Sequence, residues 1–403
     1  MKTVVVGAGP AGLIASATAG YNGSEVILLE RNEKPGKKLY ITGKGRCNFT
    51  NDCSPREFLE NVVTNPKFLY GAINAFTPLD AINLIESMGV PTKVERGNRA
   101  FPASDKASDI TKALVNYAQH ASVQFKRENV VSISKNADKF EVRTESGTID
   151  CDRVILACGG VSYPATGSNG DGFALAKSFG HTVTELRPAL VPVKLCEDVK
   201  SLMGLSLKNV SVTVGEGKSK KSLFGEMLFT AYGVSGPIVL SLSSFINKQS
   251  VNDVKLFVDL KPALNEEVLD KRILGDFEKY KNKSFKNALD DLLPKSLIPY
   301  IVSRSEIAPN KPVNSISKQE RSRLVSLLKG LDFTIDELYP VETGIVTSGG
   351  VSVDEINPKT MESKLVKGLY FAGEMIDVDA LTGGFNIQIA LSTGYLAGSS
   401  VEN

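Results

Sequence analysis

The chain has 403 residues, of which 42% are hydrophobic and 23% are charged, proportions that are ordinary for a globular protein of two or three domains. Its 47 basic and 45 acidic residues give a formal charge of +2, so the overall charge makes no case for a nucleic-acid or membrane-surface partner. No apolar run approaches the ~18 residues of a membrane span. Five cysteines without a CxxC pair favour reduced thiols in the cytoplasm, and two histidines make a metal site unexpected.

Residues 3–30 predict a strand, a glycine turn, a helix and a second strand. The turn reads Gly7-Ala8-Gly9-Pro10-Ala11-Gly12, and the second strand ends on Glu30. In a dinucleotide site of this pattern the three glycines permit the tight turn, the approach of a pyrophosphate and close helix–strand packing, and the acid accepts hydrogen bonds from a ribose. A turn that binds no ligand and a signal peptide are the alternatives. Cleavage of a signal peptide would remove the first strand of a complete βαβ unit.

The next stretch predicts helices after a loop that could hold phosphates or an electron-rich ring edge that becomes anionic on reduction. Gly43 and Gly45 flank Lys44 and precede Arg46, a pattern that favours a backbone nest with cationic side chains, although a solvated basic turn is the alternative. Residues 54–121 have mostly helical spacing, with a loop expected at 96–102.

Residues 123–190 predict short strands around one buried strand. Alternating runs between residues 123 and 151 predict a small antiparallel meander, and residues 154–158 predict a parallel strand that ends at Gly159-Gly160. A helix is expected over 173–179. His181 follows its glycine cap, so we expect a structural role for this histidine.

The remaining chain predicts an insertion and a return to the first domain. Residues 193–260 have strand patterns, with a basic hairpin tip at 215–221 and a helix at 238–245, and residues 265–331 are helical and charged. Strand patterns return at 343–353 and 369–372, before a small-residue helix at 390–398. Ligands of doubly wound sheets lie beyond the carboxyl ends of the strands, so the terminal glycines of the parallel strands predict one crevice.

These elements predict an α/β fold in three parts. A discontinuous Rossmann-like domain comprises 1–190 and 345–403, a β-rich cap that shapes a substrate pocket comprises 191–262 and 332–344, and a helical insert comprises 263–331.

Six sequence blocks resemble one family along nearly the whole chain: VVVGAGPAGL, TGKGRCNFTN, ACGGVSYPATGSNGDGFALAKSFGH, MLFTAYGVSGP, VTSGGVSVDEINPKTMESK and GLYFAGEMIDVDALTGGFNIQIALSTG. With these blocks the chain resembles the FAD-dependent oxidoreductases of the glutathione-reductase type, and within that group the YhiN-like, BaiN-related flavoproteins. The resemblance implies a GR2-type FAD-binding fold. Two positions depart from the family pattern: Glu374 stands where many relatives have aspartate, and Cys158 where the broader class often has threonine.

The resemblance also implies where FAD would bind. The expected cofactor-binding residues are Gly7, Gly9, Pro10, Ala11, Gly12, Glu30, Arg31, Lys38, Gly43, Lys44, Gly45, Arg46, Cys47, Asn48, Val130, Ala157, Cys158, Gly159, Gly373, Glu374, Asp377, Gly384, Phe385, Asn386 and Ile387. Whether Glu374 or Asp377 meets the ribitol stays open. Tyr163, Thr166 and Asn386 are candidates for hydrogen bonds to the flavin, and no catalytic residue is assigned.

The resemblance implies a flavoprotein oxidoreductase. We find no second GxGxxG in a strand–helix context, so either NAD(P)H would dock transiently over the flavin or electrons would come from the substrate. The expected reaction is NAD(P)H-linked reduction of a small organic substrate such as an enone. A flavin-dependent amine or aminoketone oxidase, a non-enzymatic flavin redox sensor or partner-binding protein, and a tRNA-modifying flavoprotein are the alternatives. A small-molecule substrate is the expected partner; no nucleic acid is expected, and the oligomeric state stays undetermined.

Overall fold

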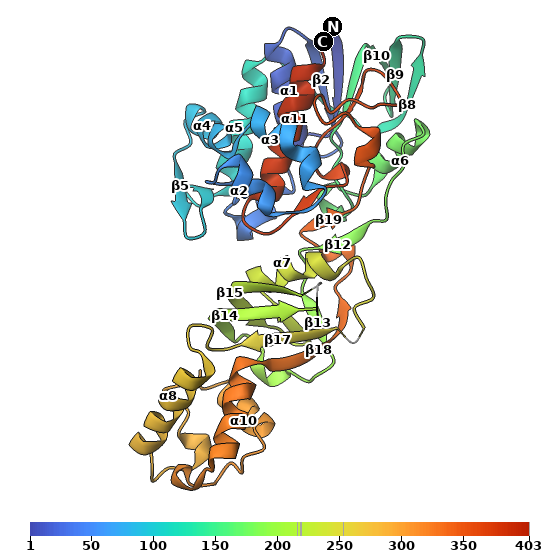
Figure 1. The fold of residues 1–403 in the computed structure, drawn as a ribbon. Helices are drawn as coiled ribbons and strands as arrows, with labels where there is room; N and C mark the ends of the chain where they lie inside the picture. The colour runs from blue at the N-terminus through green and yellow to red at the C-terminus, as the bar shows by residue number, and fades with distance from the viewer. Residues whose placement is uncertain (216, 218–219, 253, 403) are drawn as a thin grey trace. The chain divides into compact units, whose positions relative to one another are not determined.

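The computed structural model describes residues 1–215, 217, 220–252 and 254–402, and the chain forms two compact units (Figure 1). The first unit joins Met1–Ala189 to the segment that begins at Pro340, and the second unit is Leu190–Tyr339. The division of the insertion into a β-rich cap and a separate helical insert stays a prediction. The predicted hairpin tip at 215–221 lies partly outside the described residues, at 216 and 218–219.

A five-stranded parallel sheet lies at the centre of the first unit. Its strands are, in order, β20 (Leu369–Phe371), β11 (Arg153–Leu156), β1 (Lys2–Val6), β2 (Glu25–Glu30) and β7 (Gln124–Arg127). All neighbouring pairs are parallel. The prediction that residues 123–125 begin an antiparallel meander was wrong, because the helix before β7 supplies the crossover that a parallel strand needs.

A three-stranded antiparallel sheet follows β7. It consists of β8 (Val130–Asn136), β9 (Lys139–Thr144) and β10 (Thr148–Cys151), in the order β10-β9-β8. Exposed and buried residues alternate along β9, because one face of this sheet packs against the core. This part of the predicted meander is confirmed.

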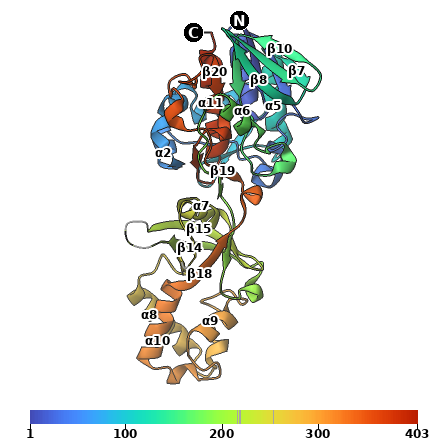
Figure 2. The same ribbon diagram turned by 90° about the vertical axis from the view of Figure 1, so that its right-hand side faces the viewer.

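Seven helices of the first unit are α1 (Pro10–Tyr21), α2 (Pro55–Glu60), α3 (Tyr70–Ala75), α4 (Pro78–Ser87), α5 (Ala107–His120), α6 (Asp171–Ser178) and α11 (Phe385–Ser400). Helices α1 and α11 lie side by side (Figure 1), and the view turned by 90° shows α11 next to β20 (Figure 2). A Cβ atom on Gly394 would lie 2.3 Å from the Ala11 carbonyl oxygen, and one on Gly398 would lie 2.3 Å from that of Ala15. The small residues of α11 therefore allow the two backbones to touch.

Short antiparallel sheets complete the first unit. They are β3 (Thr50–Asn51), β6 (Arg99–Pro102) and β5 (Thr92–Glu95); β12 (Arg187–Ala189) and β19 (Val346–Ser348); and β4 (Val62–Thr64) and β21 (Asp379–Ala380). The predicted loop at 96–102 was wrong for its second half, because β5 and β6 form a hairpin. Gly97 and Asn98 have φ values of 76° and 57°, a left-handed backbone that turns the chain within three residues.

A closed barrel forms the centre of the second unit. Its strands are, in order, β13 (Val193–Leu195), β16 (Gly233–Ser235), β15 (Lys221–Phe229), β14 (Ser206–Val214), β17 (Lys255–Asp259) and β18 (Leu331–Leu338). Because β13 also pairs with β18, the barrel closes and the sheet keeps no unpaired edge strand among these six.

Four helices accompany the barrel: α7 (Pro237–Ile246), α8 (Glu266–Lys279), α9 (Ile298–Arg304) and α10 (Lys318–Lys329). Helix α7 packs on β15, where a Cβ atom on Gly225 would lie 2.7 Å from the Ile238 side chain. Helix α10 begins with a capping box, in which Ser317 and Glu320 each accept the other's backbone N–H. Among the described residues, no helix is long and apolar enough to cross a bilayer.

Candidate functional site

The turn between β1 and α1 has the geometry that a bound pyrophosphate requires. A Cβ atom on Gly12 would lie 1.8 Å from the Gly7 carbonyl oxygen, and one on Gly7 would lie 2.6 Å from that of Ala157. Gly9, by contrast, has no atom within 4 Å of its Cβ position, and no side chain caps the N-terminus of α1. The free N–H groups and the positive dipole end therefore face open space beside Gly9, which fits a phosphate ligand.

Glu30 closes the same turn from the end of β2. Its Oε2 atom accepts a hydrogen bond from Ala8 N at 2.9 Å, and its Oε1 atom accepts one from Asn32 N at 2.8 Å. Oε1 also accepts a hydrogen bond from the Asn32 side-chain amide at 2.8 Å. Oε2 can accept a further hydrogen bond, so Glu30 can brace the glycine turn and still receive a ribose hydroxyl. The neighbouring Arg31 forms an ion pair of 2.7 Å with Asp171 at the start of α6.

The ends of β11 and β20 meet this turn. Ala157 N donates to Val6 O at 2.9 Å, and a Cβ atom on Gly373 would lie 2.8 Å from the Ala11 side chain. Gly159 follows with a φ of 77°. The structure thus brings the predicted glycines of three parallel strands to one edge of the sheet. Val130 lies at the start of β8, where it is buried, and its contact with the cofactor stays a prediction.

The loop of residues 42–48 has an unusual backbone. Gly43, Lys44, Gly45 and Cys47 have φ values of 56°, 58°, 85° and 58°. Left-handed backbone is costly for residues other than glycine, and such strain is concentrated at ligand sites. The Oδ1 atom of Asn48 is buried and has no hydrogen-bond partner within the described chain, which fits a site completed by a ligand.

Arg46 points from this loop to the β5–β6 hairpin. Its guanidinium bonds to Glu95 and lies 2.6 Å from Asp105, and it covers the Phe101 ring at 4.2 Å from the centroid. The hydrogen bond with Glu95, followed by that with Asp105, raises the pKa of Arg46. The hydrogen bond from Arg46 lowers the pKa of Glu95, and hydrogen bonds from Lys93 and then from Arg46 lower the pKa of Asp105. Arg46 therefore ties the loop to a surface hairpin, and its predicted contact with the cofactor stays a prediction.

Lys38 and Glu374 form the charged centre of the site. The Lys38 ammonium lies 2.7 Å from Glu374, whose carboxylate also accepts hydrogen bonds from the Ser162 hydroxyl and from Thr347 N, each at 2.9 Å. Burial raises the pKa of Glu374, but the Lys38 charge and these hydrogen bonds outweigh burial and lower it overall. The sequence prediction included Lys38 and Glu374 and missed Ser162 and Thr347. The Thr-Ser-Gly-Gly run of residues 347–350 was the available signal.

The segment before α11 supplies another uncapped helix N-terminus. A Cβ atom on Gly384 would lie 2.4 Å from the Thr50 carbonyl oxygen, so only glycine fits there. The Asn386 amide donates to Ala380 O at 2.8 Å and accepts from Ala380 N at 3.0 Å, which fixes the chain ahead of the helix. Ile387 is half-buried on the first turn. No side chain caps α11, so its positive end can stabilise negative charge on a ligand.

Asp377 differs from Glu374 in its surroundings. Asp377 makes a hydrogen bond through its backbone: Asp377 O accepts from the Asn65 side-chain amide at 2.7 Å. A contact of either carboxylate with the ribitol stays a prediction.

Phe385, at the first turn of α11, packs edge-on against Phe58 at 5.2 Å between ring centroids.

The two thiols near the site, Cys47 and Cys158, are weak nucleophiles. Burial raises the pKa of Cys47 to about 12, and burial also raises the pKa of Cys158 to about 12. Both thiols are therefore protonated near neutral pH and act as packing groups rather than nucleophiles. Within the described residues, no group of three or more His, Cys, Asp or Glu side chains could hold a metal ion.

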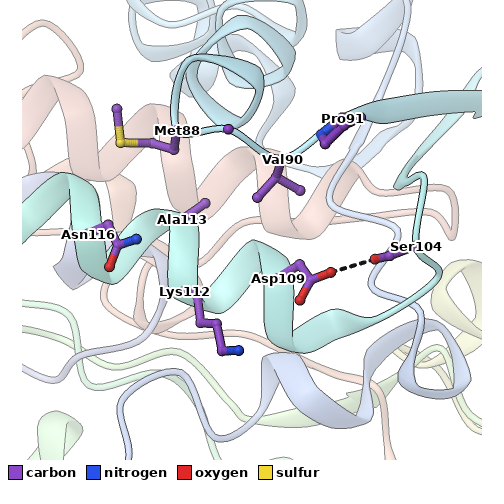
Figure 3. A pocket seen from close by; sticks show the side chains of 9 residues that line it. Met88, Val90, Pro91, Ser104, Asp109, Lys112, Ala113 and Asn116 are labelled. Atoms are coloured by element: carbon purple, nitrogen blue, oxygen red, sulfur yellow. Dashed lines mark hydrogen bonds between the residues drawn. The ribbon is translucent and has the colours of Figure 1, made fainter.

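A small cavity of about 270 Å³ lies elsewhere in the first unit, between the turn after α4 and helix α5 (Figure 3). Its wall combines apolar Met88 and Val90 with polar Asp109 and Lys112, and the Ser104 hydroxyl donates to Asp109 at 2.6 Å. No residue of the predicted cofactor site lines this cavity. It is therefore separate from the glycine turns at the sheet edge.

Comparison with known proteins gives full-length similarity. A family model described as the HI0933-like protein Rossmann domain matches residues 1–400. The chain is 32% identical over 401 residues to a 3-dehydro-bile acid delta(4,6)-reductase of Clostridium scindens, covering 98% of this chain and 97% of that protein. It is 33% identical over 401 residues to a ribosomal RNA dihydrouridine synthase of Escherichia coli, covering 97% and 96%.

Among solved structures, the fold is similar to that of 3-ketosteroid delta1-dehydrogenase from Sterolibacterium denitrificans in complex with 1,4-androstadiene-3,17-dione. The TM-score is 0.52 at 12% identity, and the alignment covers 99% of this chain and 98% of that chain. At this identity the likeness concerns the fold.

Proposed function

Because this chain belongs to the HI0933-like family and is an FAD-dependent oxidoreductase with a Rossmann-type FAD-binding fold, we propose that it reduces a carbon–carbon double bond conjugated to a carbonyl group, with NAD(P)H as electron donor. The observation that carries the proposal is the full-length similarity to a bile-acid reductase and to a dihydrouridine synthase. The first substrate that we propose is a small organic enone.

The names of the two relatives describe related chemistry. A double bond conjugated to a ketone accepts hydride at the carbon far from the carbonyl, since the developing negative charge spreads to the oxygen. The 5,6 double bond of uracil is conjugated to a ring carbonyl in the same way. One reaction class therefore covers both names, although the substrates differ greatly in size.

The residues of the crevice have distinct tasks in this proposal. Gly7, Gly9 and Gly12 would hold the pyrophosphate of FAD, and Glu30 would accept the ribose hydroxyls. The uncapped N-terminus of α11 would favour the anionic form of the reduced cofactor. FAD, when bound, supplies hydride transfer, while the protein supplies binding, orientation and charge stabilisation.

Anaerobic stopped-flow mixing tests the reductant. Purified yellow protein is mixed with NADH or NADPH, and the visible absorbance of the flavin is followed; we expect bleaching by at least one of them and reoxidation by an enone. Failure of both nucleotides to bleach the flavin would overturn the NAD(P)H linkage. Rapid oxygen consumption with an amine, without bleaching by NAD(P)H, would identify an oxidase instead.

Uridine within ribosomal RNA is the second candidate substrate, and the similarity to a ribosomal RNA dihydrouridine synthase favours it. The test is incubation of ribosomal RNA with the protein and NADPH, followed by nucleoside mass spectrometry for dihydrouridine. A Gly9→Ala variant that has lost FAD serves as the matched control. Formation of dihydrouridine by the wild-type protein alone would establish this substrate, and its absence alongside enone reduction would leave the small-molecule reductase.

A further inference from the structure

Positive charge is concentrated in one segment of the second unit. Residues 261–331 contain 14 Lys and Arg against 9 Asp and Glu, a net charge of +5, whereas the rest of the chain contains 33 basic and 36 acidic residues, a net charge of −3. This segment holds helices α8, α9 and α10 (Figure 2). The formal net charge of +2 for the whole chain does not reveal this asymmetry. The excess of basic residues creates a local positive potential in the helical segment.

Four lysines of this segment lie in a run without an acidic residue. The run is Lys-Tyr-Lys-Asn-Lys-Ser-Phe-Lys, residues 279–286, hereafter the lysine loop. Its backbone is fixed: Phe285 N donates to Lys311 O at 2.8 Å, and Val313 N donates to Lys283 O at 3.2 Å. Phe285 is fully buried and packs edge-on against Phe277 at 6.4 Å between centroids. The loop therefore presents its lysines from an anchored backbone.

The lysines of the loop differ in how far their charges are compensated. The Lys279 ammonium lies 2.6 Å from Asp291, so this charge is paired. Lys281 lies 3.9 Å from Glu278, near the limit of an ion pair. Lys283 and Lys286 are exposed and have no carboxylate within ion-pairing distance in the described part of the chain.

The Tyr280 side chain makes its contacts within the protein, with two lysines of the loop and with Asp291. The ammonium groups of Lys279 and Lys283 lie over its ring, 4.8 Å and 4.2 Å from the ring centroid. Its hydroxyl donates to Asp291 at 2.7 Å. Stacking on nucleobases needs a free aromatic face, so this loop is suited to charge recognition rather than base recognition.

We propose that the lysine loop is a docking surface for the phosphate backbone of RNA, with Lys281, Lys283 and Lys286 as its contacts. The inference rests on the second candidate substrate and deepens it, because an enzyme that acts on one uridine must hold a large polyanion. Lysine ammonium groups bind phosphates as point charges and release condensed counterions. The surface gives affinity and orientation without reading the base sequence.

Fluorescence anisotropy with a labelled ribosomal RNA stem-loop tests the surface across a salt series. The test protein is full-length K281A/K283A/K286A, and the matched control is K177A/K359A/K367A, which removes the same charge from exposed lysines of the first unit. We expect the test variant to lose roughly 10- to 100-fold in affinity, and the slope of log K against log salt to fall by about 2 to 3. We expect the control to bind as the wild type does.

The outcomes separate the surface from the reaction. Unchanged affinity and slope in the test variant, or an equal loss in the control, would overturn the docking surface. If the variant loses RNA affinity while the wild type forms no dihydrouridine, the surface stands and the uridine reaction fails. In every case FAD content and bleaching by NADPH serve as the check on folding, and we expect both to equal the wild-type values.

Discussion

Lys38 and Glu374 form an ion pair of 2.7 Å although they lie 336 positions apart in the chain. Lys38 belongs to the loop after β2, and Glu374 follows β20. The pair is 20% exposed on each side, and Ser162 contributes a hydroxyl that contacts both side chains. This contact joins the first and last segments of the first unit near the glycine turns where FAD is proposed to bind.

Glu374→Gln removes one partner of this pair and leaves the Lys38 charge unmatched. We expect a loss of about 1–3 kcal/mol in the free energy of unfolding at pH 7. Because the pKa of Glu374 is lowered in the folded state, its stabilising effect is fully present above the ordinary carboxylate pKa of about 4.3 and is lost as the pH falls through the lowered value. Urea unfolding at pH 7 and below pH 4 measures this. An equal difference between wild type and variant at both pH values would contradict the ion pair.

Gly9→Ala and Gly12→Ala should separate cofactor binding from folding. At Gly9 the Cβ position is open and φ is −74°, so alanine fits the apoprotein and obstructs only the ligand. At Gly12 the added atom would lie 1.8 Å from the Gly7 carbonyl oxygen, which should cost roughly 3 kcal/mol or more in stability. We expect Gly9→Ala to lack bound FAD and to unfold at the temperature of the wild-type apoprotein. Stoichiometric FAD in purified Gly9→Ala protein would refute the phosphate site.

The contact of Arg46 with Asp105 and Glu95 should influence FAD affinity from outside the crevice. E95Q/D105N removes both ion pairs of the Arg46 guanidinium, so the loop of residues 42–48 gains mobility. Because these ion pairs are partly exposed, we expect at most about a fivefold loss in FAD affinity. High salt should weaken the wild type towards the variant. Fluorescence titration of apoprotein with FAD measures the change. E60Q, which removes the exposed pair with Arg56, is the matched control.

Alkylation should distinguish the cysteines. Burial raises the pKa of Cys47, Cys151 and Cys158 to about 12 in each case, so these thiols are protonated at pH 8. Cys196 is exposed. We expect iodoacetamide to modify Cys196 first and the buried Cys47 and Cys151 only after unfolding, as followed by peptide mass spectrometry. Rapid modification of Cys47 in the folded protein would show that its loop opens.

The order of elements in the first unit could be predicted where the sequence pattern is local. Residues 3–30 contain the whole strand, turn, helix and strand, so the βαβ unit and its glycine turn follow from neighbouring residues. Strand β7 could not be predicted in the same way: its four residues pair equally well in either direction by composition, and only the crossover through α5 made it parallel. The β5–β6 hairpin likewise depends on partners across the sheet.

The sequence by itself determined the family, the Rossmann-type fold and the glycine positions where a side chain would collide, because these depend on contiguous motifs. Tertiary structure alone decided the pairing of Lys38 with Glu374, the addition of Ser162 and Thr347 to the site, and the attachment of Arg46 to Asp105. These contacts join residues that are distant in the chain, and charge or residue type does not specify a partner. The same reason explains why a total charge of +2 gave no sign of the lysine loop: only folding shows which lysines are paired and which stay exposed.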